Sequence, residues 1–544
     1  MSATYDAIII GGGHNGLTAA AYLGKAGLKV LVLERRAVLG GAAVTEEFHP
    51  GYRNSVASYT VSLLRPEVIE ELELKRHGYE PVRMHAHLSI LQDGRTLLMT
   101  GDEAHDRAAV GRFCARDYDN MKRFDAAVDR VGQVIRAQWL KPPPALGGGI
   151  MDLLTLLPAG REFRGLSLED RHLFMQLLTS PANEIAERWF ESEAIRNITA
   201  GHCVSGNFAS LDAPGSAIPY FHHALGEFEG ERAAWGHARG GMGAITQAMA
   251  ASGRAHGVGH RTGAAVERIL IESGRAVGVR LEGGDEFRGR YVLANTDPKR
   301  TFLKFVGREN LPEGLADGIE RLRMGHATVR MNLALSGAPE FAALSGAEAD
   351  IARGGSLTIF PTREQIEINY RAALAGQVID EPYLDIRIPS AIDDTLAPPG
   401  HHVMSLIGKY YPYRLADGPS WDHVGPSVAD RILAKLKTHM PNLQRLIVGR
   451  QFLTPLDLER VFGLTEGDIF HGRHDLDQIF GLRPHPQAAQ FATPIPGLYL
   501  CGSGAHPGGA VSGAPGRNAA MRVIQDAKRG RTPILRLPRR SRTE

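Results

Sequence analysis

Three glycines near the start of the chain constrain its fold more than any other feature. Gly11, Gly13 and Gly16 follow an apolar segment directly, and an alanine-rich segment from Asn15 to Ala26 comes next. At this G-x-G-x-x-G spacing, the glycines make a tight turn, let the backbone approach a diphosphate, and pack a helix on a strand. Because the positive end of that helix faces the phosphates, the pattern predicts a Rossmann-like β-α-β unit that binds a dinucleotide.

The residues that follow favour FAD as the dinucleotide. A second predicted strand, Lys29 to Leu33, ends at Glu34. A carboxylate at this position accepts hydrogen bonds from ribose hydroxyls and repels the 2′-phosphate of NADP. A second glycine pair, Gly40 and Gly41, lies just past the acid, where a turn can meet the diphosphate from the other side.

A second dinucleotide site is not expected. Gly240, Gly241 and Gly243 open a predicted helix that ends at Ala255, but no apolar strand precedes them and no matching acid follows. Flavin enzymes that NAD(P)H reduces commonly carry two such motifs. The single motif therefore indicates one bound FAD.

The far end of the chain repeats the strand-turn-helix order. Pro496 to Gly504 is a predicted strand that leads into a glycine turn, and a helix is predicted from Ala510 to Ala527. The 544 residues exceed what one core usually supports. We therefore expect an α/β protein, α+β overall, whose FAD-binding domain is assembled from distant segments around an inserted mixed α/β substrate domain. The predicted boundaries are 1–60, 236–300 and 490–530 for the FAD domain, 61–235 and 301–489 for the substrate domain, and 531–544 for a basic tail.

Composition excludes several other classes of protein. The three cysteines, Cys114, Cys203 and Cys501, form no C-x-x-C pair, which argues against a thiol-disulfide centre or a structural zinc site. No apolar run reaches the roughly 18 residues of a membrane span, and no signal peptide is evident, so a cytoplasmic protein is expected. The last 17 residues carry seven Lys or Arg and one Glu. This tail is either solvated or in peripheral contact with anionic lipid, and no nucleic-acid partner is expected.

The C-terminal run from Leu498 to Ala520, with Gly-Ala-His-Pro-Gly-Gly at its centre, resembles the FAD-dependent phytoene desaturase and carotenoid isomerase superfamily. Within that superfamily the chain is most similar to the branch named for pyridine nucleotide-disulfide oxidoreductase domain-containing protein 2. The resemblance implies a glutathione reductase type of fold. It also implies one FAD held by both chain ends, with its flavin facing an apolar cavity.

The resemblance also implies which positions hold the cofactor. Val266 would meet adenine through its backbone, and Ser503 stands where many related flavoproteins have an acid. The expected cofactor-binding residues are Gly11, Gly13, His14, Asn15, Gly16, Glu34, Arg35, Gly40, Gly41, Ala42, Ala43, Val266, Asn295, Gly502, Ser503, Gly513, Ala514 and Gly516.

Two histidines are candidates for acid-base work. His506 is expected beside the flavin, where it either transfers a proton or fixes the turn by hydrogen bonding. His471 lies in a glycine-bounded turn and has the same two interpretations. His471 and His474 are three residues apart, but no third ligand is spaced to complete a metal site, so none is predicted.

These features predict an FAD-dependent oxidoreductase that desaturates or isomerises an extended apolar, isoprenoid-like substrate and passes the electrons to oxygen, a quinone or another acceptor. Within the enzyme class, amine or alcohol oxidation is the alternative. An FAD-binding scaffold with little catalysis is the alternative from another class. The oligomeric state stays open.

Overall fold

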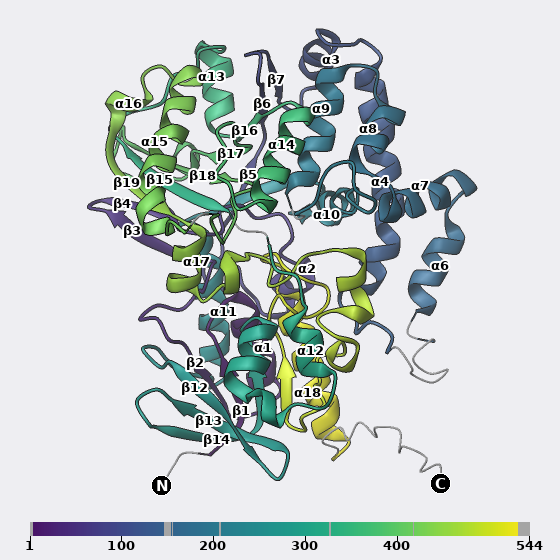
Figure 1. Cartoon of the computed structure of the whole chain (residues 1–544), viewed down its shortest axis with the longest axis vertical. Helices are drawn as coiled ribbons and strands as arrows, with labels where there is room; N and C mark the ends of the chain where they lie inside the picture. The colour runs from purple at the N-terminus through teal and green to yellow at the C-terminus, as the bar shows by residue number, and fades with distance from the viewer. Residues whose placement is uncertain are drawn as a thin grey trace.

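A computed structural model describes residues 4–145, 154, 156–205, 208–325, 328–416 and 418–530. Figure 1 shows two parts: the lower one holds both described chain ends, and the upper one holds a second sheet beside a group of helices. The basic tail predicted at 531–544 lies outside the described residues. Within those residues, no helix is both long and apolar enough to cross a bilayer.

The lower part is built on a seven-stranded sheet. Its central strands are parallel and buried, as expected for a sheet covered on both faces. Strands far apart in the chain are neighbours in it, which confirms the α/β class. In sheet order they are β11 (Gly259–Arg261), β2 (Val30–Leu33), β1 (Thr4–Ile10), β14 (Glu286–Ala294), β13 (Arg275–Leu281) and β12 (Val266–Glu272), with β20 (Leu498–Leu500) also paired to β14.

Helix α1 (His14–Lys25) packs against both α11 (Met242–Ala255) and α18 (Ala514–Lys528). Nearly all of α1 is buried. Small residues make this possible: a Cβ added to Gly24 would lie 2.6 Å from the Val258 side chain. The alanine-rich composition of α1 is thus a consequence of close packing by two helices and a sheet.

The upper part contains a second seven-stranded sheet, mostly antiparallel. In sheet order the strands are β19 (Ile447–Leu453), β15 (Val329–Leu335), β18 (His402–Gly408), β17 (Leu384–Arg387), β16 (Ser356–Phe360), β6 (His87–Leu91) and β7 (Thr96–Met99).

Helices cover this second sheet and extend to one side of it (Figure 1). The longer of them bury one apolar stripe; in α4, Phe124, Val128 and Val131 face the core. The remaining helices are α2 (Pro66–Glu71), α3 (Glu103–Gly111), α4 (Asp117–Trp139), α6 (Leu157–Gly165), α7 (Leu168–Thr179), α8 (Ala182–Trp189), α9 (Glu193–Gly201), α10 (Pro219–Leu225), α12 (Leu315–Glu320), α13 (Gly346–Arg353), α14 (Arg363–Leu374), α15 (Trp421–His439), α16 (Leu443–Leu446) and α17 (Pro455–Phe462). Short strands are β3 (Thr45–His49), β4 (Tyr52–Ser55), β5 (Pro81–Met84), β8 (Glu227–Phe228), β9 (Glu231–Arg232) and β10 (Trp235–Ala238).

The C-terminal helix begins later than the sequence predicts. It was expected from Ala510, but α18 starts at Ala514. Gly513 has a left-handed φ of 72°, which breaks the helical path, so residues 510–513 form part of a turn instead.

One buried arginine ties this C-terminal turn to a preceding loop. Arg483 is 1% exposed, and its Nη2 donates to the carbonyls of Ser503 at 2.9 Å and Phe470 at 2.7 Å. Its Nη1 donates to further carbonyls of the 472–478 loop. Burial lowers the pKa of Arg483 to about 10, so the guanidinium stays charged at neutral pH.

We predict that Arg483→Met destabilises the protein by about 3 kcal/mol or more, because several buried carbonyls lose their donor at once. The midpoint of thermal unfolding should fall by several degrees. Arg414→Met, at an exposed position, is the matched control and should leave the midpoint unchanged. Equal midpoints for the two variants would contradict the prediction.

Candidate functional site

A cleft opens where β1, β2 and β14 end, and it encloses about 1020 Å³ of empty space, including its open mouth. The strand ends of a parallel sheet are where α/β proteins bind ligands. Of the predicted site residues, the walls include Gly11, Gly13, His14, Glu34, Arg35, Gly41, Ala42, Val266, Asn295, His471 and Ser503.

Two glycines of this cleft have no room for a side chain, and their small size leaves the space beside the backbone to a diphosphate. A Cβ on Gly13 would lie 3.0 Å from Asn295 Nδ2, and a Cβ on Gly41 would lie 3.0 Å from Gly13 Cα. The N-terminus of α1 has no side-chain cap, so its first backbone N–H groups remain available to phosphate oxygens. The cradle fits the dinucleotide that the sequence predicts.

Glu34 is held in a fixed orientation at the cleft wall. The side chain is 6% exposed; one oxygen accepts the Gly12 N–H at 2.8 Å, and the other accepts the Arg36 N–H at 2.9 Å. Each carboxylate oxygen has a second lone pair. The carboxylate can therefore still accept ribose hydroxyls, which is the role predicted for it.

Positive charge lines the same cleft. Arg35 donates to the carbonyls of Arg460 and Val461 at the end of α17, at 2.8 and 2.6 Å. Arg300 and Lys304 also line the cleft, and neither is predicted from the sequence. A helical turn after β14 brings both residues to the cleft. Neither belongs to a local sequence motif, so the sequence pattern does not reveal them. Together these cations attract an anionic diphosphate.

The other predicted cofactor residues do not line the cleft. Several pack directly behind it: a Cβ on Gly16 would lie 2.2 Å from the Gly11 carbonyl oxygen, and one on Gly516 would lie 2.1 Å from that of Asn15. Their contact with the cofactor stays a prediction. The residues of this group are Asn15, Gly16, Gly40, Ala43, Gly502, Gly513, Ala514 and Gly516.

Two histidines face the cleft and are neutral at pH 7. Burial lowers the pKa of His14 to about 4, although its Nε2 contacts the Ala510 carbonyl at 3.0 Å. Burial also lowers the pKa of His471, whose backbone is left-handed with φ 59°. His471 Nδ1 is buried without a hydrogen-bond partner and so can accept a proton or a ligand N–H.

His506 lies outside this cleft, in the wall of a neighbouring apolar pocket that encloses about 720 Å³ of empty space, open solvent included. Trp139 of α4, Phe221 of α10 and Phe480 form other parts of that wall. His506 is 3% exposed, its Nε2 contacts the Gln138 carbonyl at 3.3 Å, and its Nδ1 has no partner. Burial lowers the pKa of His506 to about 4.

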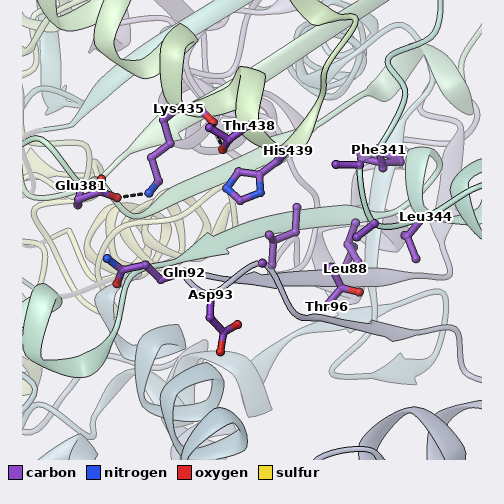
Figure 2. Close-up of a pocket in the computed structure, with 14 residues that line it drawn as sticks. Leu88, Gln92, Asp93, Thr96, Phe341, Leu344, Glu381, Lys435, Thr438 and His439 are labelled. Atoms are coloured by element: carbon purple, nitrogen blue, oxygen red, sulfur yellow. Dashed lines mark hydrogen bonds and ion pairs between the residues drawn. The ribbon is translucent and has the colours of Figure 1, made fainter.

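A third hollow, between the β6–β7 hairpin and α15, shares no lining residue with either (Figure 2). Its charged groups already have partners: Lys435 pairs with Glu381 in Figure 2, and Asp93 pairs with Arg95 at 2.7 Å. None of the predicted site residues lines it. We do not assign the active site to this hollow.

The cysteines of the described chain are free, and two of them are inert. Burial raises the pKa values of Cys203 and Cys501, which keeps both thiols protonated. Cys114 lies apart on the surface of the helical group. The geometry thus gives no support to the disulfide chemistry in the name of the branch that the sequence resembles.

This fold and cleft define an FAD-dependent oxidoreductase. The family model described as flavin containing amine oxidoreductase matches residues 16–330, and the chain belongs to this family. Family membership and the fit of the cleft together establish FAD as the cofactor.

Relatives match almost the whole chain in sequence. Pyridine nucleotide-disulfide oxidoreductase domain-containing protein 2 of Rattus norvegicus is 39% identical, with 96% of this chain and 94% of that protein covered. Phytoene desaturase (lycopene-forming) of Pseudescherichia vulneris is 26% identical, over 95% and 99%. These relatives confirm the superfamily and the branch. A triple mutant of putrescine oxidase has a similar fold, with a TM-score of 0.61, 17% identity, and 97% and 99% coverage.

We predict that Gly13→Val yields protein without bound FAD, because the added side chain fills the space between Asn295 and the cleft. The purified variant should lack flavin absorbance. Gly111→Val is the control, since nothing lies within 4 Å of a Cβ at that exposed helix position. A yellow Gly13→Val protein would overturn the assignment of this cleft.

A second prediction concerns acid stability. Burial lowers the pKa values of His14 and His506 to about 4 in the folded protein, whereas an unfolded histidine has a pKa of about 6.5. The unfolded chain therefore binds more protons, and stability should fall as the pH drops from about 6.5 toward 4. Each histidine contributes at most about 1.4 kcal/mol per pH unit.

Thermal unfolding midpoints at several pH values test this dependence. His506→Gln should flatten the fall in midpoint between neutral and acidic pH, whereas His256→Gln, at an exposed position, should not. An unchanged slope in the His506 variant would show that its imidazole charges freely in the folded protein.

Proposed function

We propose that this FAD-dependent oxidoreductase desaturates, or isomerises, carbon–carbon bonds of an extended apolar, isoprenoid-like substrate. The observation that carries the proposal is the apolar pocket beside His506. Ile135, Ile218 and Leu225 continue its apolar wall. The name of the phytoene desaturase relative supports a substrate of this kind.

The protein's own residues position the substrate and handle its proton. Apolar walls exclude water from the bond that reacts. FAD, when bound, supplies the group that accepts hydride. His506 is neutral at pH 7 and has an unpartnered Nδ1, so it can take up the proton that desaturation releases. The pocket wall at Gly509 continues into Ala510, whose carbonyl contacts His14 of the cofactor cleft.

Oxygen or a quinone is the proposed electron acceptor. The chain has one dinucleotide motif, and a second motif for a nicotinamide partner is missing from the sequence. Electrons therefore leave by a small acceptor that needs no nucleotide site of its own.

Amine oxidation is the second candidate. The description of the family and the fold likeness to putrescine oxidase favour it. An amine is cationic at neutral pH, however, and no carboxylate lines the apolar pocket among the described residues. A cation in such a pocket would lack a counter-charge, which disfavours its binding.

Anaerobic mixing of the FAD-loaded protein with squalene or with putrescine separates the two candidates. We expect the hydrocarbon to bleach the flavin absorbance and the diamine to leave it unchanged. Ile135→Phe should slow bleaching by about tenfold or more, because it overfills the pocket. Ile351→Phe, at an exposed position, is the control. Bleaching by putrescine with none by the hydrocarbon would sink the proposal.

A further inference from the structure

The second sheet has one apolar face and one polar face, and both are buried. On β15, Arg330 and Asn332 point to the same side, because alternate residues of a strand share a face. Asp385 and Arg387 do so on β17, and the pairing registers place them in line with the β15 residues. A buried sheet face normally carries apolar side chains, so this face needs a separate explanation.

The polar face holds more positive charge than negative charge. Exposed fractions are 1% for Arg330, 4% for Arg387, 8% for Lys409 and 7% for Asp385. These four residues, with Tyr59, are called the basic cluster below. Burial lowers the pKa of Arg330 to about 10 and that of Lys409 to about 8. At neutral pH the basic cluster therefore carries three cations against one carboxylate.

Asp385 is already engaged within the basic cluster. It accepts from Arg387 Nη1 at 2.6 Å and from the Tyr59 hydroxyl at 2.5 Å. Burial and the neighbouring Asp385 carboxylate raise the pKa of Tyr59, so the phenol stays neutral and supplies no negative charge. This carboxylate can balance only one of the three cations.

Arg330 has neutral partners only. Its guanidinium donates to the carbonyls of Ser55 at 3.0 Å and Val56 at 3.2 Å and to the Ser405 hydroxyl at 2.9 Å. Arg330 Nη1 and Arg387 Nε are buried and have no hydrogen-bond partner. Two buried donors and an excess of cationic charge are costly unless an anion completes the site.

The basic cluster borders the cofactor cleft. Ser58 donates its N–H to the carbonyl of Ala42 at 2.9 Å, and Ala42 lines the cleft. The next residue, Tyr59, places its ring 4.6 Å from the Arg330 guanidinium and 5.2 Å from that of Arg387. Tyr59 keeps some exposure to solvent, whereas the four charged residues of the basic cluster are buried.

We propose that the basic cluster binds a carboxylate at one end of the substrate. Two donors on two guanidinium groups match the two oxygens of a carboxylate, and charge-assisted bonds of this kind are strong. The substrate is then an apolar chain that carries an acid, a class more specific than a plain hydrocarbon. That the substrate has an apolar chain rests on the proposed function. That it carries an acid rests on the basic cluster alone.

Equilibrium binding to the FAD-loaded protein, measured by calorimetry without turnover, tests the acid. The probes are decanoate, decanol and decylamine, which share one chain length and differ in charge. We expect decanoate to bind about ten- to a hundredfold more tightly than decanol, and decylamine to bind weakest. Equal affinities for decanoate and decanol would overturn the proposal.

Variants locate the effect in the basic cluster. Arg330→Gln should weaken decanoate binding by about tenfold or more and leave decanol unchanged, whereas Arg330→Lys should retain most of the affinity. Arg450→Gln, on the exposed part of β19, is the matched control. If Arg330→Gln fails to fold, as judged by its melting midpoint, Lys409→Met takes its place. An undiminished affinity for decanoate in the folded variant would refute the site.

The outcome is separable from that of the proposed function. Squalene bleaching tests the apolar chemistry and does not involve an acid. Tight, Arg330-dependent decanoate binding without squalene bleaching supports the basic cluster and counts against the hydrocarbon substrate. Bleaching of the flavin by squalene, with no preference for decanoate over decanol, supports the hydrocarbon substrate and counts against the acid-binding site.

Discussion

Close contact between backbones at the N-terminus of α1 is the constraint on which the rest of the structure depends. Gly16 brings α1 against the turn after β1, and Gly516 brings α18 against α1; at both positions a Cβ would lie within 2.2 Å of a carbonyl oxygen. No side chain can enter these two contacts without separating the helices from the sheet. The same contacts that hold α1 and α18 on the sheet therefore also fix the position of the cleft wall that a diphosphate would touch.

The sequence predicts well the features that local spacing determines. The turn at Gly11 to Gly16 and the strand that ends at Glu34 both follow from short-range patterns, and the structure has both. Arg300 and Lys304 could not be found in this way, because only the position of β14 in the sheet brings them to the cleft. The same holds for Arg330 and Asp385, which meet through strand register across residues far apart in the chain.

Burial divides the titratable groups near the cleft into two kinds. The histidines lose their charge, since burial lowers the pKa values of His14, His471 and His506. The arginines keep theirs, because even a lowered pKa near 10 lies far above neutrality for Arg330 and Arg483. Hence the histidines of the cleft and of the apolar pocket are neutral, whereas fixed positive charge remains at Arg330 on the second sheet and at Arg483 beside Ser503.

The sheet order of the lower part has a consequence for biosynthesis. β20, near residue 500, pairs with β14, and the helix after it packs on α1, near residue 20. A ribosome adds about 5 to 20 residues per second, so the opening β-α-β unit waits on the order of tens of seconds for its last neighbours. During that interval the flank of α1 that α18 covers in the folded protein stays exposed. Incorporation of FAD would then mark the completion of synthesis.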